Sequence, residues 1–432
     1  MRNQERSHLC VLALFLVLPA CSSSTSSGPS DGGDNGGAIA SGGATNVGTG
    51  TGGAVGTGGK TGGGTGGGGA VGSGGRVGSD AGVGRDGARP VDSKATSDLA
   101  VDACTGDACT VAGRVARPSY NTGTGFFVKD GKLYDAAGVE FRMRGVDKCH
   151  YDAAWPGIPN THANTIRWGV PLWLAGSVTG KLMQDSINAK IVPMAGVWYT
   201  AGTYANTDMV TCKDETAPLT TAVSQWVAQA ATFKPFEKYV LINIANEWGP
   251  SGSVVWRDAY ISAVAKLRAA GYLSTLVIDA GGCGQDPTSI ANYAKAVFDS
   301  DPQQNIVFDI HIYGNWSNGG GQSWQTDLTR GLDSLAATGL PIIVGEFGAG
   351  RNLGGSPTLI TPGEIITAAE TRGMGWLAWA WDDPPSNATE TDFALSRNGQ
   401  YASSADLTSY GKDVVENATY GLLHLAQPAT IF

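Results

Sequence analysis

The feature that most constrains the fold is a regular alternation of short β-branched runs with helix-compatible segments. Eight runs rich in Val, Ile and aromatic residues are bounded by Gly, Pro, Asn or Asp, at 141–147, 164–170, 190–197, 239–247, 274–282, 305–314, 341–348 and 373–381. The segments between most of them, such as 224–233, 259–268 and 291–298, carry apolar residues at the three- and four-residue spacing of helices. Strand and helix repeated in this way predict a (β/α)8 barrel, the TIM-barrel fold of the α/β class.

Two of these runs end in a glutamate. The apolar run from residue 239 stops abruptly at Asn246, Glu247 and Trp248, and the run from residue 341 stops at Glu346, with no basic residue beside it. The carboxyl ends of barrel strands build the active site, so both carboxyl groups are expected to face one pocket. Either glutamate alone would be an ordinary strand-end residue reaching solvent. Two of them in a matching barrel indicate acid/base and nucleophilic chemistry.

Further short motifs accompany the glutamates. They are Gly-Phe-Phe-Val at 125–128, Leu-Tyr-Asp at 133–135, Met-Arg-Gly-Val at 143–146, Asn-Thr-Ile-Arg at 164–167, Ile-His-Ile-Tyr at 310–313 and Gly-Trp-Leu-Ala-Trp-Ala-Trp at 375–381. With this ordered set, the region from residue 125 to the end of the chain resembles glycoside hydrolase family 5. Its local sequence is nearest to the bacterial endo-β-1,4-mannanases of that family of retaining β-glycanases.

The resemblance implies a double displacement in which Glu247 is the acid/base and Glu346 the nucleophile. It also implies residues that support the carboxyl groups and the sugar: Arg167, Asn246, His311 and Tyr313. Chemistry supports these roles independently, because a retaining glycosidase needs two carboxyl groups about 5 to 5.5 Å apart. The pKa of the acid should rise through burial and the neighbouring charge, while a guanidinium and a hydroxyl donor keep the nucleophile ionised.

His311 has a second interpretation, as a core histidine with a satisfied ring. Its two-residue spacing from Tyr313 places both side chains on the same side of a strand, which favours the site.

Aromatic residues are expected to form the sugar-binding surface. The chain has 12 Trp, and five of them lie at or just past the ends of predicted strands: Trp198, Trp248, Trp316, Trp379 and Trp381. Flat rings stack on the apolar faces of pyranoses. The resemblance implies Trp379 as the platform at the cleaved bond, and Trp381, on the same strand face, is the alternative. Trp226 and Trp256 fall in predicted helices and are expected to serve in packing.

Two departures from the family pattern leave the substrate open. The third run leads into Trp198 and Tyr199, whereas the third strand of the mannanase-like relatives ends with a histidine. The first run ends unusually, in Asp147, Lys148, Cys149 and His150. Loops at this face decide which polysaccharide fits. The predicted activity is therefore retaining, endo-acting hydrolysis of a β-1,4-linked polysaccharide, with mannan first and glucan second. The alternative is a non-catalytic glycan-binding barrel, which the complete set of site residues argues against.

The first 20 residues resemble a lipoprotein signal peptide. Arg2 and Arg6 precede an apolar run at 9–18, followed by Pro-Ala and Cys21 as the lipidated residue. The run is short of the roughly 20 residues that a transmembrane helix needs, so a cleaved signal is expected. Ser22 does not resemble an inner-membrane retention signal. The sequence thus predicts export and a lipid anchor at Cys21 on the outer membrane or cell surface.

Residues 21–112 are predicted to be a disordered tether in front of a catalytic domain at 113–432. The tract is rich in Gly, Ser, Thr and Ala with few large apolar residues, so it cannot form a core. Its G-x-G-x-x-G matches carry no phosphate-binding meaning without a strand before them and a helix after them. A Gly-rich chain of ~75 residues spans roughly 45 to 50 Å, enough to let an anchored enzyme reach bulky polymer.

The remaining cysteines fit an oxidising compartment. They are odd in number: Cys104, Cys109, Cys149, Cys212 and Cys283. Cys104 and Cys109 could close a small loop, and the other three follow the first, third and fifth runs. A loop disulfide is predicted, although the spacing leaves the pairing open. A zinc site with His150 matches no compact metal signature, so no metal and no cofactor are expected.

The formal net charge of −9, without a basic cluster, argues against a nucleic-acid partner. A neutral polysaccharide requires no charged surface. With the barrel placed, no second folded domain or internal repeat remains, and a monomer is expected.

Overall fold

A computed structural model describes residues 113–148, 155–203, 205–319, 326–348, 360–382 and 393–432. Several predictions fall outside these ranges: the signal at 1–20, the lipidation site Cys21, the tether at 21–112, and Cys104, Cys109, Cys149 and His150. Among the described residues, no helix is both long enough and apolar enough to cross a bilayer.

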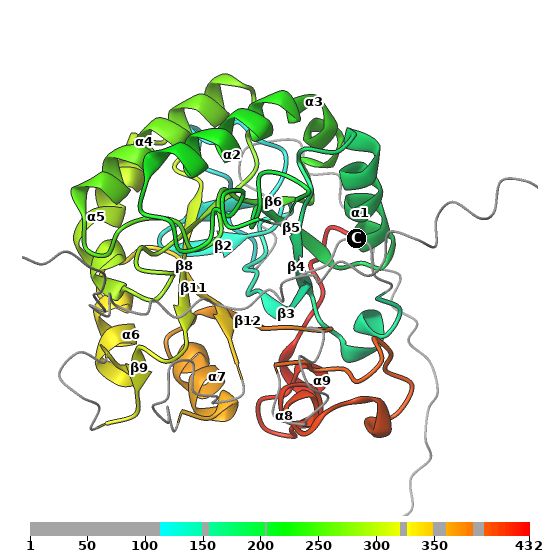
Figure 1. Cartoon of the computed structure of the whole chain (residues 1–432). Coiled ribbons are helices and arrows are strands. Elements are labelled where there is room, and N and C mark those ends of the chain that lie inside the picture. Colours follow the sequence, from blue (N-terminus) through cyan, green and yellow to red (C-terminus); the bar gives the residue numbers. More distant parts are fainter. Residues whose placement is uncertain (1–112, 149–154, 204, 320–325, 349–359, 383–392) are drawn as a thin grey trace, which may run out of the picture. The chain divides into compact units, whose positions relative to one another are not determined.

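The described residues form a closed parallel barrel (Figure 1). Its strands are β3 (Arg144–Lys148), β4 (Thr165–Gly169), β5 (Val192–Gly196), β6 (Leu241–Asn243), β7 (Leu276–Asp279), β8 (Ile306–Ile312), β11 (Ile342–Phe347) and β12 (Gly375–Ala378). Each pairs in parallel with the next, and β12 pairs with β3 to close the ring. Seven of the strands lie within their predicted runs, and β3 extends one residue past the run at 141–147. The predicted TIM barrel is therefore confirmed.

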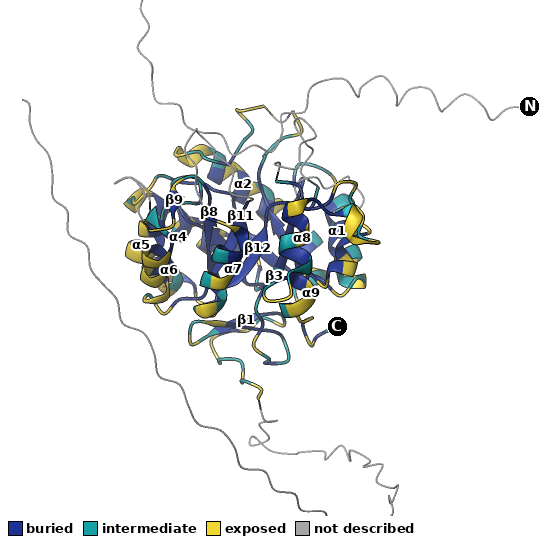
Figure 2. Ribbon diagram, turned by 90° about the horizontal axis from the view of Figure 1, so that it is seen from below, coloured by how far each residue is buried: buried dark blue, intermediate teal, exposed yellow. Residues whose placement is uncertain are grey.

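Helices surround the barrel and bury one face each against it (Figure 2). They are α1 (Gly176–Asn188), α2 (Thr216–Ala228), α3 (Ala230–Phe233), α4 (Val254–Ala269), α5 (Pro287–Ser300), α6 (Leu328–Ala336), α7 (Pro362–Thr371), α8 (Ser409–Glu416) and α9 (Leu422–Leu425). Short 3-10 turns cover Ile158–Thr161, Lys234–Phe236 and Ser404–Asp406. Trp226 and Trp256 are fully buried packing residues, as predicted.

Side-chain caps set the starts of several helices. Ser253, Asp286 and Asp327 accept backbone N–H groups at the starts of α4, α5 and α6. Thr361 and Glu364 form a reciprocal capping box at the start of α7. These caps satisfy N–H groups that the helix itself leaves unpaired.

A hairpin of β1 (Phe127–Lys129) and β2 (Lys132–Tyr134) packs under the amino-terminal end of the barrel. Its apolar side chains join the inward-facing residues near the strand starts, including Val192, Leu241, Val277, Val307, Ile343 and Leu377. Two residues further along the strands, side chains point inward again. Most of those positions hold polar groups: Asp147, Arg167, Asn243, Asp279 and Asp309. The barrel interior is therefore apolar at the base and charged at the carboxyl ends.

Candidate active site

Glu346 is directed to the pocket by an irregularity in β11. The pairing with β8 shifts between Val344 and Glu346. A Cβ atom on Gly345 would lie 1.9 Å from an Asp309 carboxylate oxygen, and the Gly345 N–H donates to Asp309 at 2.6 Å. Gly345 thus faces the barrel interior. Because the strand bulges at this point, the next residue, Glu346, also faces inward and lines the pocket.

Glu247 lies beyond the end of β6, which stops at Asn243. Its φ is 51°, in the left-handed region that non-glycine residues occupy rarely. The Glu247 N–H donates to Asp279 at 2.8 Å, and its C=O accepts from the Cys212 N–H at 3.2 Å. Side-chain and loop partners therefore replace the strand pairing here and hold Glu247 at the rim of the barrel.

Arg167 on β4 is the central cation of the site. Its guanidinium donates to Glu346 at 2.5 Å, to Asn246 at 2.6 Å and to Asn243 at 3.0 Å. Further bonds at 3.3 and 3.2 Å reach the carboxylates of Asp147 and Asp279. Although burial opposes the charge, these carboxylates raise the pKa of Arg167 above its usual value, so the guanidinium stays positive beside Glu346.

His311 and Tyr313 on and after β8 contact the two glutamates. His311 Nδ1 lies 2.9 Å from Glu247 Oε1 and 3.5 Å from Glu346 Oε2. The Tyr313 hydroxyl donates to Glu346 at 3.1 Å. The predicted neighbours of the carboxyl groups are thus brought together, and the core interpretation of His311 is replaced by a contact with both glutamates.

Burial and charge separate the proton affinities of these groups. Burial raises the pKa of Glu247 to about 7, and the neighbouring Glu346 charge adds to the rise, against the opposing hydrogen bond from His311. Burial also raises the pKa of Asp147 well above its usual range. Burial lowers the pKa of His311, but the charges of Glu346 and Asp309 outweigh it and bring the pKa well above its ordinary value. Glu247 thus has the proton affinity of a general acid near neutral pH.

The two glutamates share a small pocket with an aromatic wall. Its lining residues are Trp198, Tyr199, Met209, Thr211, Asn246, Glu247, Tyr313, Glu346, Trp379 and Phe393. The rings of Trp198 and Trp379 lie 6.2 Å apart between centroids. The Trp198 ring also lies 4.5 Å from the Arg167 guanidinium carbon. Trp198 and Trp379 are therefore placed where sequence analysis expected a sugar-binding surface.

Three other predicted sugar-binding tryptophans are placed differently. Trp248, Trp316 and Trp381 are fully buried in the packing layer between strands and helices. Their indole N–H groups donate to the carbonyls of Glu215, Gln285 and Gly399. These three expectations are corrected, because the rings offer no surface to a sugar. For Trp381 the reason is that β12 ends at Ala378, so strand alternation from Trp379 does not extend to it.

Several polar residues inside the barrel were not predicted from the sequence. Asn243, Asp279 and Asp309 are fully buried and contact Arg167, Glu247 or Gly345. The signal in the sequence that could have identified them is a polar residue within an apolar run, at a position whose side chain points into the barrel. Tyr199, Met209, Thr211 and Phe393 were also missed, since they come from loops with no periodic pattern. Thr211 accepts from the Asn246 side-chain amide at 2.9 Å and so orients it.

Two residues from the unusual end of the first run are also described. Asp147 accepts a hydrogen bond from Arg167, and Lys148 is a buried ion-pair partner of Asp382.

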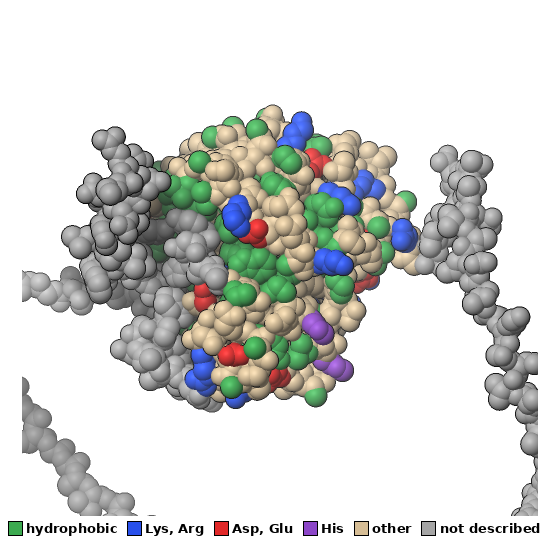
Figure 3. Space-filling view, turned by 90° about the vertical axis from the view of Figure 1, so that its right-hand side faces the viewer, with side chains coloured by type: hydrophobic (Ala, Val, Ile, Leu, Met, Phe, Trp, Pro, Cys, Tyr) green, Lys and Arg blue, Asp and Glu red, His purple; other side chains and the backbone are tan. Residues whose placement is uncertain are grey.

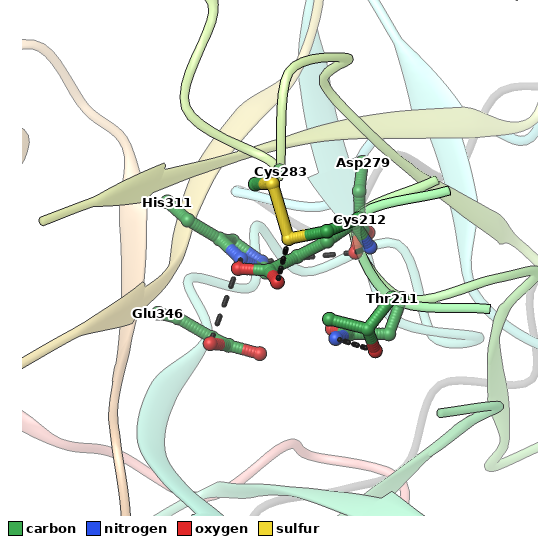
Figure 4. Close-up of a disulfide and its surroundings, with 8 residues drawn as sticks. Thr211, Cys212, Asp279, Cys283, His311 and Glu346 are labelled. Atoms are coloured by element: carbon green, nitrogen blue, oxygen red, sulfur yellow. Dashed lines mark hydrogen bonds and ion pairs between the residues drawn. A yellow bond between two sulfur atoms is a disulfide. The ribbon is translucent and has the colours of Figure 1, made fainter. Parts of the chain in front are cut away.

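A loop disulfide joins Cys212 and Cys283 (Figure 4). The predicted loop disulfide is thus confirmed, and the structure supplies the pairing that the spacing left open.

Two groups in the described residues have the spacing of metal ligands: Glu247 with His311 and Glu346, and Asp279 with Asp309 and His311. Arg167 already places a positive charge near three of these carboxylates, those of Glu346, Asp279 and Asp309. The expectation of no metal stays a prediction.

A parallel barrel whose carboxyl-terminal end holds two neighbouring carboxyl groups in an aromatic pocket has the architecture of a barrel glycosidase. A family model described as "Cellulase (glycosyl hydrolase family 5)" matches residues 154–384. The chain is 34% identical over 320 residues to a mannan endo-1,4-beta-mannosidase of Salipaludibacillus agaradhaerens, covering 71% of this chain and 96% of that protein. It is 30% identical to a protein of the same name from Cellvibrio japonicus, covering 71% and 69%.

Solved structures of β-mannanases are also similar to this chain. A β-mannanase from Thermomonospora fusca has a TM-score of 0.60 and 30% identity, and the match covers 71% of this chain and 99% of that one. The chain belongs to glycoside hydrolase family 5, and it is a glycoside hydrolase.

Proposed function

We propose that the protein is an endo-acting β-1,4-mannan hydrolase that works by double displacement, with Glu346 as nucleophile and Glu247 as acid/base. The observation that carries this proposal is the pairing of the two glutamates: they face one pocket, and an oxygen of each lies within 4.8 Å of the other and of His311 Nδ1. This spacing fits the shorter carboxyl separation of retaining enzymes, whereas inverting enzymes need roughly 6.5 to 9.5 Å for a water molecule.

In the first step, the Glu346 carboxylate attacks the anomeric carbon as the bond to the leaving oxygen breaks. Glu247 gives its proton to that oxygen, which departs as a hydroxyl of the leaving chain. Arg167 and Tyr313 both donate to Glu346, so they hold the attacking carboxylate in one orientation.

In the second step, water attacks the anomeric carbon of the ester to Glu346. Glu247, now a carboxylate, takes the proton of the water, and the Glu346 carboxylate leaves. The raised pKa of Glu247 suits both roles, because the acid and base forms are both accessible near pH 7.

Mannan is the proposed substrate because the relatives that match most of this chain carry that name. The two mannosidases above match 71% of the chain. A structure titled as a mannohexaose complex of Thermomonospora fusca β-mannanase matches with a TM-score of 0.59 and 29% identity. The face of the protein in Figure 3 mixes basic and acidic side chains without a large patch of one sign, which accords with a neutral polymer.

The proposal extends to location. A signal peptide at 1–20, lipidation at Cys21 and a tether at 21–112 would present the catalytic domain at 113–432 outside the cell. The support is the basic, apolar and Cys21 pattern of the first residues together with the glycine-rich composition that follows.

The test is release of reducing sugar from galactomannan, glucomannan, carboxymethyl cellulose, xyloglucan and xylan. We expect the highest kcat/KM on the mannans, with a rapid fall in viscosity from internal cleavage. Preference for carboxymethyl cellulose would make the protein an endoglucanase. Binding without release from any polymer would favour the non-catalytic alternative.

A further inference from the structure

The Cys212–Cys283 disulfide lies against the proposed acid/base. Cys212 follows β5, Cys283 follows β7, and Glu247 follows β6, which lies between them in the barrel. The bond therefore joins the loops on both sides of the loop that carries Glu247. Figure 4 shows it beside the carboxyl groups, with His311 to one side and Thr211 to the other.

At both ends of the disulfide, backbone hydrogen bonds connect the loop to a residue of the site. The Cys212 N–H donates to the carbonyl of Glu247 at 3.2 Å, and the carbonyl of Gly284, next to Cys283, accepts from the His311 N–H at 2.8 Å. A Cβ atom on Gly284 would lie 2.7 Å from His311 Nδ1 and 3.1 Å from Glu247 Cγ. The cross-link thus connects the segment that holds the glutamate to the segment that packs on its histidine.

These loops need such support because of their backbone conformations. Cys212, Glu247 and Cys283 have φ values of 56°, 51° and 54°. Residues with a side chain adopt this left-handed region rarely, and it persists where surrounding structure holds it. A covalent bond between the two flanking residues restricts the loops on both sides of Glu247.

The sulfur of Cys212 also covers one oxygen of the Glu247 carboxyl group. Cys212 Sγ lies 3.6 Å from Glu247 Oε2, while Oε1 faces His311. A disulfide sulfur bears no hydrogen, so it cannot donate to a carboxylate. It accepts weakly from a protonated carboxyl group, and it occupies space in which water or a thiol would otherwise donate to the charged form.

We propose that the Cys212–Cys283 disulfide positions the acid/base, by clamping the loops beside Glu247 and by covering Oε2 with an atom that cannot donate a hydrogen bond. The inference rests on the proposed function, because it requires Glu247 to be the acid. Cys212 and Cys283 are positioning residues in this account. The pKa of about 7, which burial gives to Glu247, accords with it.

The test is the double substitution Cys212→Ala with Cys283→Ala in the full chain. Values of kcat/KM across pH are measured on mannan and on an aryl β-mannoside whose leaving group needs little proton assistance. We expect kcat/KM on mannan at pH 7 to fall at least about tenfold and the aryl glycoside to lose much less. The alkaline limb on mannan should move toward acid by about half a unit or more, since water reaching Oε2 stabilises the carboxylate.

Reduction of the wild-type protein gives a second measurement if the variant does not fold. A phosphine reductant should reproduce the selective loss on mannan, and reoxidation should restore it. Where the double variant folds, the same reductant applied to it is the matched control and should leave its kinetics unchanged, because the other cysteines remain there. Where it does not fold, recovery of the selective loss on reoxidation is the control. Peptide mass mapping establishes that the Cys212–Cys283 bond is present before treatment and absent after it.

Equal losses on both substrates with an unmoved alkaline limb would make the disulfide a plain structural cross-link and overturn the inference. Unchanged kinetics would overturn it as well. These failures are distinct from failure of the proposed function, in which wild-type protein cleaves no polymer or Glu247→Ala loses both substrates equally.

Discussion

At the level of single residues, the site is a set of buried charges that compensate one another. Arg167 and His311 are fully buried and lie among the carboxyl groups of Asp279, Asp309 and Glu346. Buried charges are costly unless paired. In this arrangement Glu346 accepts hydrogen bonds from two donors, and the pKa of Glu247 is raised. Double displacement needs this difference, because one carboxyl group must attack as a carboxylate while the other carries a proton.

The nucleophile is tested by Glu346→Gln. Turnover should fall at least about a thousandfold on every substrate, because among the described residues that line the pocket the remaining carboxyl group is that of Glu247, the proposed acid/base. An activated fluoro-sugar should label Glu346 in the wild-type protein, as read by peptide mass spectrometry. Labelling of another residue would contradict the assignment.

The acid/base is tested by Glu247→Ala. Mannan hydrolysis should slow roughly 10² to 10⁴-fold, whereas the glycosylation step of an activated aryl glycoside should be nearly retained. Single-turnover kinetics separate that step from deglycosylation.

The pH profile gives a second measurement of the same residue. The pKa of Glu247 is raised from 4.5 to about 7, so the required proton is present below about pH 7 and is lost as pH rises through it. The alkaline limb of wild-type kcat/KM on mannan should therefore lie near pH 7. The limb should be absent when Glu247→Ala acts on the aryl glycoside, and its persistence there would assign it to another group.

Trp198 is the residue at which specificity is tested. It stands where the resemblance expects a histidine, and its ring packs on the Arg167 guanidinium and lines the pocket. Mannose and glucose differ only at the 2-hydroxyl, and an indole can offer that group a single N–H. Trp198→His should change the mannan-to-glucan ratio of kcat/KM by at least about tenfold, or roughly 1.4 kcal/mol. If both activities fall together at a fixed ratio, Trp198 only packs the wall.

At the level of elements, two strands depart from regular pairing where they deliver a glutamate. β6 ends four residues before Glu247, although the apolar run predicts a strand up to that point. The side chain of Asp279 takes the Glu247 N–H that a neighbouring strand would otherwise accept. β11 continues through Glu346 but shifts its register there. Neither departure has a signal in hydrophobic periodicity.

The bulge in β11 is tested by Gly345→Ala. A Cβ atom there meets the Asp309 carboxylate at 1.9 Å, so either Asp309 or the strand must move. We expect a loss of about 1 to 3 kcal/mol in the free energy of unfolding and a fall in kcat, because Glu346 is the next residue. Gly180→Ala in α1 is the control: its nearest contact would be an ordinary 3.8 Å to Phe236, and helix propensity predicts a gain of roughly 0.5 to 1 kcal/mol. Denaturant unfolding and kcat measure both, and equal behaviour would contradict the steric account.

At the level of the whole molecule, the catalytic domain and the amino-terminal tract are predicted to act independently. Cys21→Ser should prevent lipidation and move the protein from the detergent phase to the soluble exported fraction, or leave it unprocessed. Deletion of most of the glycine tract should leave activity on small oligosaccharides unchanged, since its composition offers few large apolar residues for a core. The same deletion should reduce the action of anchored cells on insoluble polymer. Phase partitioning and amino-terminal sequencing check the first change. Wild-type protein that is soluble without detergent would contradict the anchor.

The barrel and its two glutamates were readable from sequence for a physical reason. Strand and helix periodicity are local properties of the chain, and parallel closure brings every strand's carboxyl end to one face. Glu247, Glu346, Arg167, His311 and Tyr313 could therefore be predicted to meet.

Tertiary structure alone decided which aromatic rings face the pocket and which cysteines pair. Trp379 lines the pocket and Trp381 is fully buried in the packing layer, because β12 ends at Ala378 and strand alternation does not relate the two side chains that follow it. Cys212 and Cys283 are separated by 71 residues and meet because their loops flank one strand of the closed barrel. Periodicity describes a residue's own element, whereas these outcomes depend on where separate loops come to lie in space.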